Sequence, residues 1–310
     1  MDIPVAFFAF NRPYHTLETL KSLAKNKEAI NTDLYAFIDG HRKTSEIQLI
    51  DNVEKIIKSF KGEFRSLVIE RSDINLTGGM NQKRGISKVL SMYESVISLE
   101  DDIYVSENFL SYMKNALITY RNDKDVWHIN AFNYPVKLNG DFDCFFMRLM
   151  QCWGWATWKD RWNQFIDNPL SCDPFYLKEI FTEKMKNEFD LNLRRSNFWS
   201  QVENNAEGKL NNTWDIFWYS FIFLNNGLCL TPKISLTRNF GHDGSGIHIT
   251  YDKELLKSFV NQKEINIFPE IKQENKYCIN QIRKYLKRKN NLYSKLSRKF
   301  NFLNRFYKYS

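Results

Sequence analysis

Short apolar runs alternate with helical patterns over the first 125 residues of the chain. The run at residues 3–10 predicts a buried central strand, and those at 34–38, 67–69 and 96–99 predict three further strands. Between these runs, apolar residues recur every three or four positions, which predicts helices. The clearest helical pattern is Ile47, Ile50, Val53, Ile57 and Phe60. Strands that alternate with helices indicate an α/β fold with a largely parallel sheet.

Polar residues follow the predicted strands directly. Asn11 and Arg12 come after the first strand, Asp39 and Gly40 after the second, and residues 100–102 after the fourth. Because ligands of parallel sheets bind beyond the carboxyl ends of the strands, we expect these side chains at one edge of the sheet. Asp39 either accepts hydrogen bonds from a ribose or a base, or belongs with Gly40 to an ordinary turn.

The residues after the fourth strand form an acidic triplet, Glu100, Asp101 and Asp102. Three adjacent carboxylates repel one another, so the triplet needs a positive partner. A hard divalent cation such as Mg²⁺ or Mn²⁺ takes oxygen ligands and would bridge the triplet to a diphosphate. The alternative is a solvated acidic turn at the start of the following helix.

A Gly-containing loop at residues 75–79 opens the third predicted helix and is followed by Lys83 and Arg84. Backbone amides at such a helix start are suited to a phosphate or a sugar. The loop matches neither the P-loop nor the dinucleotide-binding pattern, so we treat it as a secondary candidate.

Three tryptophans, Trp153, Trp155 and Trp158, lie close together in residues 152–158. If this segment is extended, their side chains point the same way and form a wall for a sugar ring. The other interpretation is a buried aromatic cluster.

Two further segments carry polar groups suited to chemistry. Asp215 precedes a long apolar run, where it either caps a helix or acts as a general base at the edge of a cleft. Residues 239–248 are rich in glycine and contain His242, Asp243 and His248. This composition is typical of a mobile loop that closes over a ligand.

The net charge of +8 is concentrated at one end of the chain. Residues 276–310 contain eleven Lys or Arg and no Asp or Glu, so the rest of the chain is slightly acidic. This distribution argues against a basic body that binds nucleic acid. Apolar residues in the basic segment recur at helical spacing, which predicts a membrane-surface helix. The alternatives are a helix packed on the body and a nucleic-acid contact.

Five cysteines without any CxxC spacing indicate free thiols in a reducing compartment. The sequence shows no secretory leader pattern and no stretch of about 18 apolar residues. We therefore expect a cytoplasmic protein, held peripherally on the inner face of the cytoplasmic membrane by the basic segment.

Taken in order, these motifs resemble bacterial GT-A-fold glycosyltransferases, distantly similar to the N-acetylglucosaminyltransferase I family. The resemblance covers roughly residues 3–250. It rests on residues 10–13, 39–40, 99–102, 152–158, 213–215 and 239–248. It implies a GT-A domain at residues 1–255, in which a mixed, mainly parallel sheet supports a Rossmann-like nucleotide-sugar half (about 1–125) and an acceptor half (about 126–255). Residues 256–310 would form a helical basic extension.

The resemblance also implies roles for the residues named above. In the acidic triplet, Asp102 would contact the metal, with Asp101 and Glu100 around the ribose and the donor sugar. Asp215 would be the catalytic base. The remaining assignments place Asn11, Arg12, Asp39 and Asp243 at the nucleotide-sugar, His248 at the metal, and Trp153, Trp155 and Trp158 at the acceptor.

The implied reaction is inverting transfer of a sugar from a UDP-linked donor to a hydroxyl of a glycan or lipid-linked glycan, in surface polysaccharide synthesis. It would depend on Mn²⁺ or Mg²⁺. A sugar nucleotidyltransferase is one competing function, but its Gly-rich basic loop after the first strand is replaced here by residues 11–14. The other is a non-catalytic carbohydrate- or membrane-binding protein on a transferase-like fold.

Overall fold

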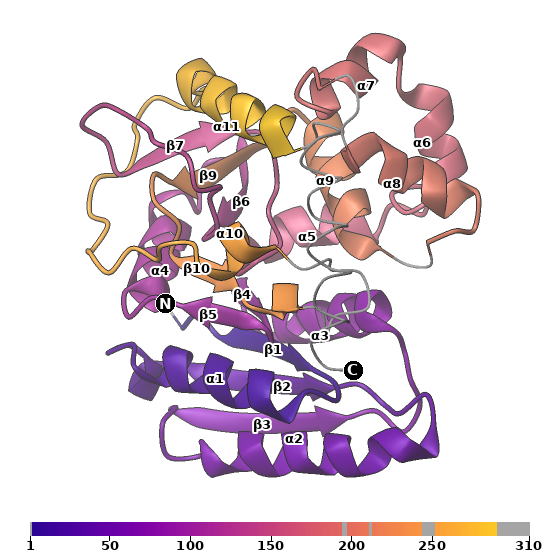
Figure 1. The fold of residues 1–310 in the computed structure, drawn as a ribbon, viewed down its shortest axis with the longest axis vertical. Helices are drawn as coiled ribbons and strands as arrows, with labels where there is room; N and C mark the ends of the chain where they lie inside the picture. The colour runs from indigo at the N-terminus through magenta and orange to yellow at the C-terminus, as the bar shows by residue number, and fades with distance from the viewer. Residues whose placement is uncertain (1, 194–196, 211–212, 244–251, 290–310) are drawn as a thin grey trace, which may run out of the picture.

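The computed structural model describes residues 2–193, 197–210, 213–243 and 252–289. An eight-stranded sheet runs through the molecule in the order β3-β2-β1-β4-β8-β6-β9-β7 (Figure 1). Its first four strands are mutually parallel and come from the predicted apolar runs. They are β1 (Val5–Ala9), β2 (Asp33–Ile38), β3 (Ser66–Arg71) and β4 (Ser95–Glu100).

The second half of the sheet is mixed. β8 is antiparallel to both of its neighbours, β4 and β6, while β6 and β9 are parallel and β7 is antiparallel to β9. Six strands therefore share one direction. The structure confirms the predicted α/β class with a mixed, mainly parallel central sheet. The bounds of these four strands are β6 (Val126–Asn130), β7 (Cys144–Met147), β8 (Trp155–Trp158) and β9 (Leu228–Pro232).

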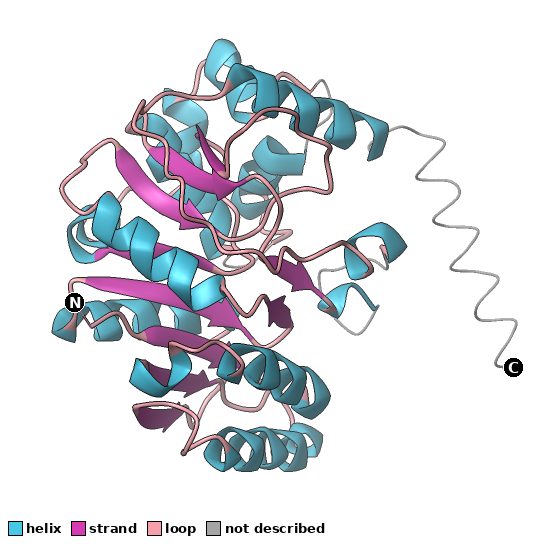
Figure 2. Cartoon of the chain, turned by 90° about the vertical axis from the view of Figure 1, so that its left-hand side faces the viewer, coloured by secondary structure: helices cyan, strands magenta, loops and turns pink. Residues whose placement is uncertain are grey.

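Helices cover both faces of the sheet, and each face has its own apolar core (Figure 2). One face carries α1 (Pro13–Ala24), α2 (Ile47–Ser59) and α4 (Phe109–Thr119). The other carries α3 (Gly78–Met92), α5 (Lys159–Ile166) and α9 (Trp214–Leu224). Burial on both faces explains why β1, β2 and β4 read as apolar runs, whereas the edge strand β3 has no fully buried residue.

A group of short helices packs against α9 at the upper right of Figure 1. It consists of α6 (Pro174–Ile180), α7 (Glu183–Phe189) and α8 (Asn197–Ala206). Asp173 and Thr182 cap α6 and α7 by accepting hydrogen bonds from backbone amides. Aromatic contacts hold the group to α9, among them Phe189 on Tyr219, with ring centroids 4.1 Å apart.

A second, two-stranded sheet lies directly beyond the acidic triplet. β5 (Ile103–Val105) pairs antiparallel with β10 (Thr237–Asn239). The 3-10 helix Gly241–Asp243 follows β10. The chain thus returns from the second half of the sheet to the end of β4. Two further 3-10 helices, Ala29–Asn31 and Thr44–Glu46, precede β2 and α2 respectively.

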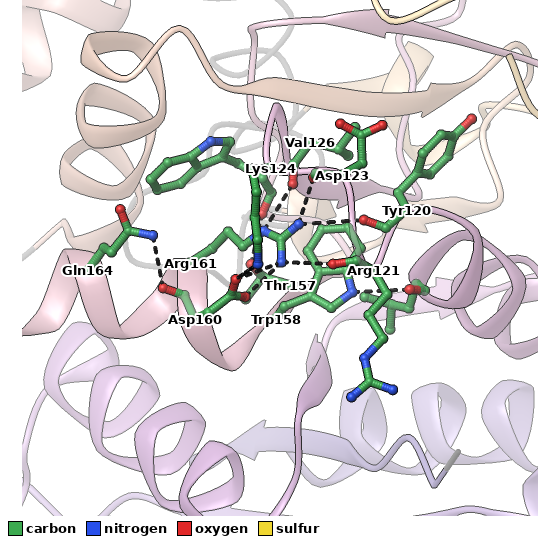
Figure 3. A network of polar contacts seen from close by, with 12 residues as sticks. Tyr120, Arg121, Asp123, Lys124, Val126, Thr157, Trp158, Asp160, Arg161 and Gln164 are labelled. Atoms are coloured by element: carbon green, nitrogen blue, oxygen red, sulfur yellow. Dashed lines mark hydrogen bonds and ion pairs between the residues drawn. The ribbon is translucent and has the colours of Figure 1, made fainter. Parts of the chain in front are cut away.

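Arg161, on α5, joins three elements from a buried position (Figure 3). Its guanidinium lies over the ring of Trp158, 4.5 Å from the centroid, and pairs with the carboxylate of Asp160. It also donates hydrogen bonds to backbone carbonyl oxygens between the end of α4 and the start of β6. The accepting residues are Tyr120, Arg121, Asp123 and Val126.

The first part of the basic segment forms α11 (Lys276–Lys289), which packs on the body. Cys278, Ile279, Ile282 and Tyr285 are buried along its inner face. The basic end of α11 pairs with acidic residues around α10 (Lys253–Leu256). For these fourteen residues, the packed-helix alternative is therefore correct and the membrane-surface prediction is wrong. Residues 290–310 lie outside the described residues.

All five cysteines are free thiols. In the part of the chain that the structure describes, no helix has the length and apolar character needed to cross a bilayer.

Candidate active site

The acidic triplet lies at the carboxyl edge of the sheet, between the two parallel strands β1 and β4. Glu100 is the last residue of β4 and is in register with Phe8 of β1. Asp101 and Asp102 are buried in the turn toward β5, whereas Glu100 is half-buried. The chain leaving β1 passes beside this turn, so the polar residues after both strands meet, as the sequence predicted.

Arg12 supplies a positive partner for the triplet. Its guanidinium forms an ion pair with Asp101, and its Nη1 lies 3.1 Å from Asp102 Oδ2. The amide of Phe10 donates to Asp101 Oδ2 at 3.4 Å, and the Thr19 hydroxyl donates to the Asp101 carbonyl at 2.7 Å. Burial nevertheless raises the pKa of Asp101, although the ion pair with Arg12 opposes this effect.

Asp215 approaches the triplet from the other half of the molecule. It lies in the first turn of α9, whose N-cap residue is Thr213, so Asp215 is not the cap itself. The thiol of Cys152 lies 3.9 Å from Asp215 Oδ2. Burial, followed by the charges of Asp102, Asp101 and Asp215, raises the pKa of Glu100. Glu100 and Asp215 are thus close enough to interact electrostatically.

Asp39 is buried, and the residues around it engage both of its carboxylate oxygens. Oδ1 accepts hydrogen bonds from the amides of Gly40, at 2.9 Å, and Leu76, at 2.8 Å; Oδ2 accepts one from the Asn75 side chain at 3.0 Å. A Cβ on Gly40 would lie 2.3 Å from the Ile74 backbone, so only glycine fits there. Asp39 therefore anchors the loop before α3, and its contact with a nucleotide stays a prediction.

The loop that Asp39 anchors ends in an unusual backbone conformation. Thr77, the N-cap residue of α3, has φ 70° and ψ 153°, a region that residues with a side chain rarely adopt. Gly78 and Gly79 then begin the helix. Burial raises the pKa of Asp39. The positive charge of Arg84, on the same helix, opposes this shift without cancelling it.

Asn11 faces a carboxylate that the sequence patterns did not reveal. Its side chain donates to Glu46 Oε1 at 3.2 Å, and Glu46 also accepts hydrogen bonds from Arg42 and Lys43. The Arg42 guanidinium lies 4.8 Å from the centroid of the Phe10 ring. Glu46 is buried in a short 3-10 helix. Because that helix has no apolar periodicity, no sequence pattern pointed to Glu46.

The tryptophan prediction is wrong for two of the three residues. Trp155 and Trp158 are 1% and 2% exposed and belong to different cores, on opposite faces of the sheet. Residues three apart on a strand point to opposite faces, and β8 is covered on both. Trp153, just before β8, is half-buried and contacts Phe132 and His242, with centroids 4.4 Å and 5.1 Å away. Of the three, only Trp153 is exposed enough to contact an acceptor, and that role stays a prediction.

The segment after β10 lies against the acidic triplet. The amide of Phe240 donates to the Asp102 carbonyl at 3.0 Å, and a Cβ on Gly241 would lie 2.3 Å from Asp102 Oδ2. Asp243 Oδ2 lies 3.3 Å from His15 Nε2 on α1, and the His15 ring stacks on Phe240. Asp243 thus pairs with a helix next to the triplet, and its contact with a nucleotide-sugar stays a prediction.

His248 lies outside the described residues, and so does the rest of the Gly-rich loop from residue 244 onward. The structure therefore does not bear on the prediction that this histidine contacts a metal. His15, by contrast, was not identified from the sequence, because a histidine on a helix carries no signal of its spatial neighbours.

Within the described ranges, no three His, Cys, Asp or Glu side chains are grouped so that they would hold a metal ion by themselves. The oxygens of Asp101 and Asp102 are nevertheless the hard donors that Mg²⁺ and Mn²⁺ prefer. One or two carboxylates are enough when phosphate oxygens and water complete the coordination. The residues fit a divalent ion that obtains its remaining ligands from a diphosphate.

No family model matches the chain, and no curated protein matches it either. Solved structures to which the chain is similar include S. aureus TarS 1-349, at 14% identity and TM-score 0.39, matched over 55% of this chain and 50% of that one. The chain covers 33% of the longer S. aureus TarS structure. It thus spans half or less of the length of these TarS chains.

Other similar structures are a Pyrobaculum calidifontis mannosyltransferase, PcManGT, in complex with GDP-Man and Mn²⁺, and the galactosyltransferase LgtC. PcManGT has 9% identity and TM-score 0.41 over 71% of this chain and 69% of that one. LgtC has 10% identity and TM-score 0.39 over 71% and 70%. At these values the likeness carries no argument about this chain, and similarity to the N-acetylglucosaminyltransferase I family stays a prediction.

Proposed function

We propose that this chain is a glycosyltransferase that moves a sugar from a nucleotide-sugar to an acceptor hydroxyl. The observation that carries the proposal is the ion pairing of Arg12 with the acidic triplet at the carboxyl edge of the sheet, with Asp215 in electrostatic reach of Glu100. These groups come from the ends of β1 and β4 and from the start of α9. Ligands of α/β sheets bind at this edge.

On the donor side, the acidic triplet faces the ribose and the donor sugar, and the loop anchored by Asp39 lies at the nucleotide. Arg12 binds the negative charge that develops on the departing diphosphate. A divalent ion, Mn²⁺ or Mg²⁺, bound with the diphosphate at Asp102, would stabilise the same charge. Burial of Asp101 and Asp102 limits access of water to this part of the site.

On the acceptor side, Asp215 is the general base. It removes the proton of the acceptor hydroxyl while that oxygen attacks the anomeric carbon from the face opposite the leaving group. The bond from the anomeric carbon to the diphosphate oxygen breaks, and the configuration inverts. The half-buried Trp153, which contacts His242 in the segment after β10, offers a ring surface to an acceptor sugar. Glycans and lipid-linked glycans of surface polysaccharides are the proposed acceptors.

The test is the single substitution Asp215→Asn. General-base assistance is typically worth about 10²–10⁴-fold in rate, so kcat should fall by that factor while the donor Kd stays unchanged. UDP-sugars and GDP-sugars would first be screened for transfer by the unmodified protein. The kcat and the donor Kd would then be measured with the donor and acceptor that react. The control is Glu183→Gln, which removes an exposed carboxylate from the first turn of α7.

Normal turnover by the Asp215→Asn protein would remove Asp215 from the mechanism. The released product separates the competing functions: a nucleoside diphosphate supports glycosyl transfer, and pyrophosphate supports a nucleotidyltransferase. Specific nucleotide-sugar binding without either product would support a binding protein.

A further inference from the structure

The Arg12 guanidinium covers the two aspartates of the acidic triplet. The side chains of Asp101 and Asp102 are only 4% and 6% exposed, whereas that of Arg12 is 24% exposed. Arg12 therefore lies between these carboxylates and the solvent. Its two terminal nitrogens contact different aspartates, so the arginine neutralises them as a pair.

The segment after β10 covers Asp102 from another side. Gly241 is buried, and a Cβ at this position would lie 2.3 Å from Asp102 Oδ2 and 3.1 Å from its Cγ. The same Oδ2 accepts the hydrogen bond from Arg12 Nη1. In the described part of the chain, this oxygen thus lies between Gly241 and the Arg12 guanidinium.

A divalent ion and Arg12 compete for the same oxygens. Mg²⁺ requires ligand oxygens at about 2.0–2.1 Å and retains several of its waters. It would have to displace Nη1 from Asp102 while a guanidinium remains on the neighbouring Asp101, and the two cations repel each other. A diphosphate changes this balance because it offers Arg12 an alternative anionic partner and gives the ion further oxygens.

We propose that Arg12 is a built-in counter-ion that keeps divalent metal out of the acidic triplet until a diphosphate binds. The metal and the nucleotide then bind together rather than the metal first. The role of the diphosphate rests on the proposed function. The exclusion of metal in the absence of nucleotide does not rest on it.

The test is a titration with Mn²⁺ alone, in which the electron paramagnetic resonance signal of the free ion reports binding. The unmodified protein should bind Mn²⁺ weakly, and Arg12→Gln should bind it at least tenfold more tightly. The double variant Arg12→Gln, Asp102→Asn should lose that gain. Arg71→Gln is the matched control, because Arg71 also pairs with two carboxylates, Asp51 and Glu54, and should leave Mn²⁺ affinity unchanged.

A second comparison covers the case in which Arg12→Gln does not fold, as judged by circular dichroism. Arg12→Lys retains the positive charge and should bind Mn²⁺ alone as weakly as the unmodified protein does. Addition of UDP or GDP should raise the Mn²⁺ affinity at least tenfold, both in Arg12→Lys and in the unmodified protein. Tight binding of Mn²⁺ alone by the unmodified protein, or no effect of either nucleotide, would overturn the proposal. Since no readout involves sugar transfer, a failed Asp215→Asn test would leave this result standing.

Discussion

At the scale of single residues, Thr77 shows how the site loop departs from ordinary backbone geometry. Its φ of 70° with ψ of 153° lies in a region that glycine adopts freely and other residues adopt at a cost of about 1–3 kcal/mol. The hydrogen bonds from Leu76 and Asn75 to Asp39 on one side, and the start of α3 on the other, hold the residue there.

We predict that Thr77→Gly stabilises the protein by about 1 kcal/mol in urea unfolding. The relief of strain exceeds the extra entropy that glycine gives the unfolded chain, itself up to about 1 kcal/mol. The control is Thr182→Gly, at the N-cap of α7, where φ is −71° and the hydroxyl accepts a hydrogen bond from Met185. Thr182→Gly should not raise the free energy of unfolding. A loss of stability in Thr77→Gly would show that the threonine is not strained.

The residues of the candidate site were predicted from sequence where they directly follow a strand. Arg12 and the acidic triplet are in this class, because strand order alone brings them to one edge. Glu46 and His15 were missed because each becomes a site residue through a partner distant in sequence. Trp155 was misassigned because a sequence does not show how many sheet faces are covered.

At the scale of elements, the first half of the sheet was predictable and the second was not. β1 to β4 are short apolar runs separated by helices, and their ends agree with the predicted runs to within a few residues. The antiparallel β8 sits between β4 and β6, and β6 pairs with β9 from far along the chain. These pairings have no local signature, because nothing in a strand's own sequence names its partner.

Arg161 gives a prediction about how elements are joined. Replacing it with leucine leaves several buried carbonyl oxygens between α4 and β6 without their charged donor. Hydrogen bonds to charged groups contribute about 1.5–3 kcal/mol each, so Arg161→Leu should destabilise the protein by about 3 kcal/mol or more. Urea unfolding provides the measurement.

The control for this prediction is Arg121→Leu, since the Arg121 side chain is exposed and only its carbonyl takes part in the network. Surface changes of this kind typically stay within about 0.5 kcal/mol. Equal effects of the two substitutions would mean that the network around Arg161 does not hold the elements together.

At the scale of the whole molecule, the basic C-terminal segment divides at Lys289. Residues up to this point belong to the packed body, because the apolar face of α11 is buried and its end is ion-paired with α10. The proposed membrane contact therefore concerns residues 290–310, which contain five Lys or Arg and no acidic residue. Each basic residue near an anionic membrane contributes about 1 kcal/mol.

We predict that a chain ending at Lys289 keeps the thermal stability of the full chain but floats less with anionic lipid vesicles. A chain ending at Asn275 should lose stability, because it exposes the apolar residues that α11 covers. Vesicles of neutral lipid are the control. Neither the full chain nor the chain ending at Lys289 should float with them. Equal flotation of the full chain and the chain ending at Lys289 would discard the membrane contact.

The position of β4 inside the sheet has a consequence for how the protein is made. β4 pairs on one side with β1, which precedes it, and on the other with β8, which the ribosome delivers only later. Until β8 emerges, the open hydrogen-bonding edge of β4 can pair with a strand of another nascent chain. The strand that ends in the acidic triplet therefore needs protection from other chains until β8 has been synthesised.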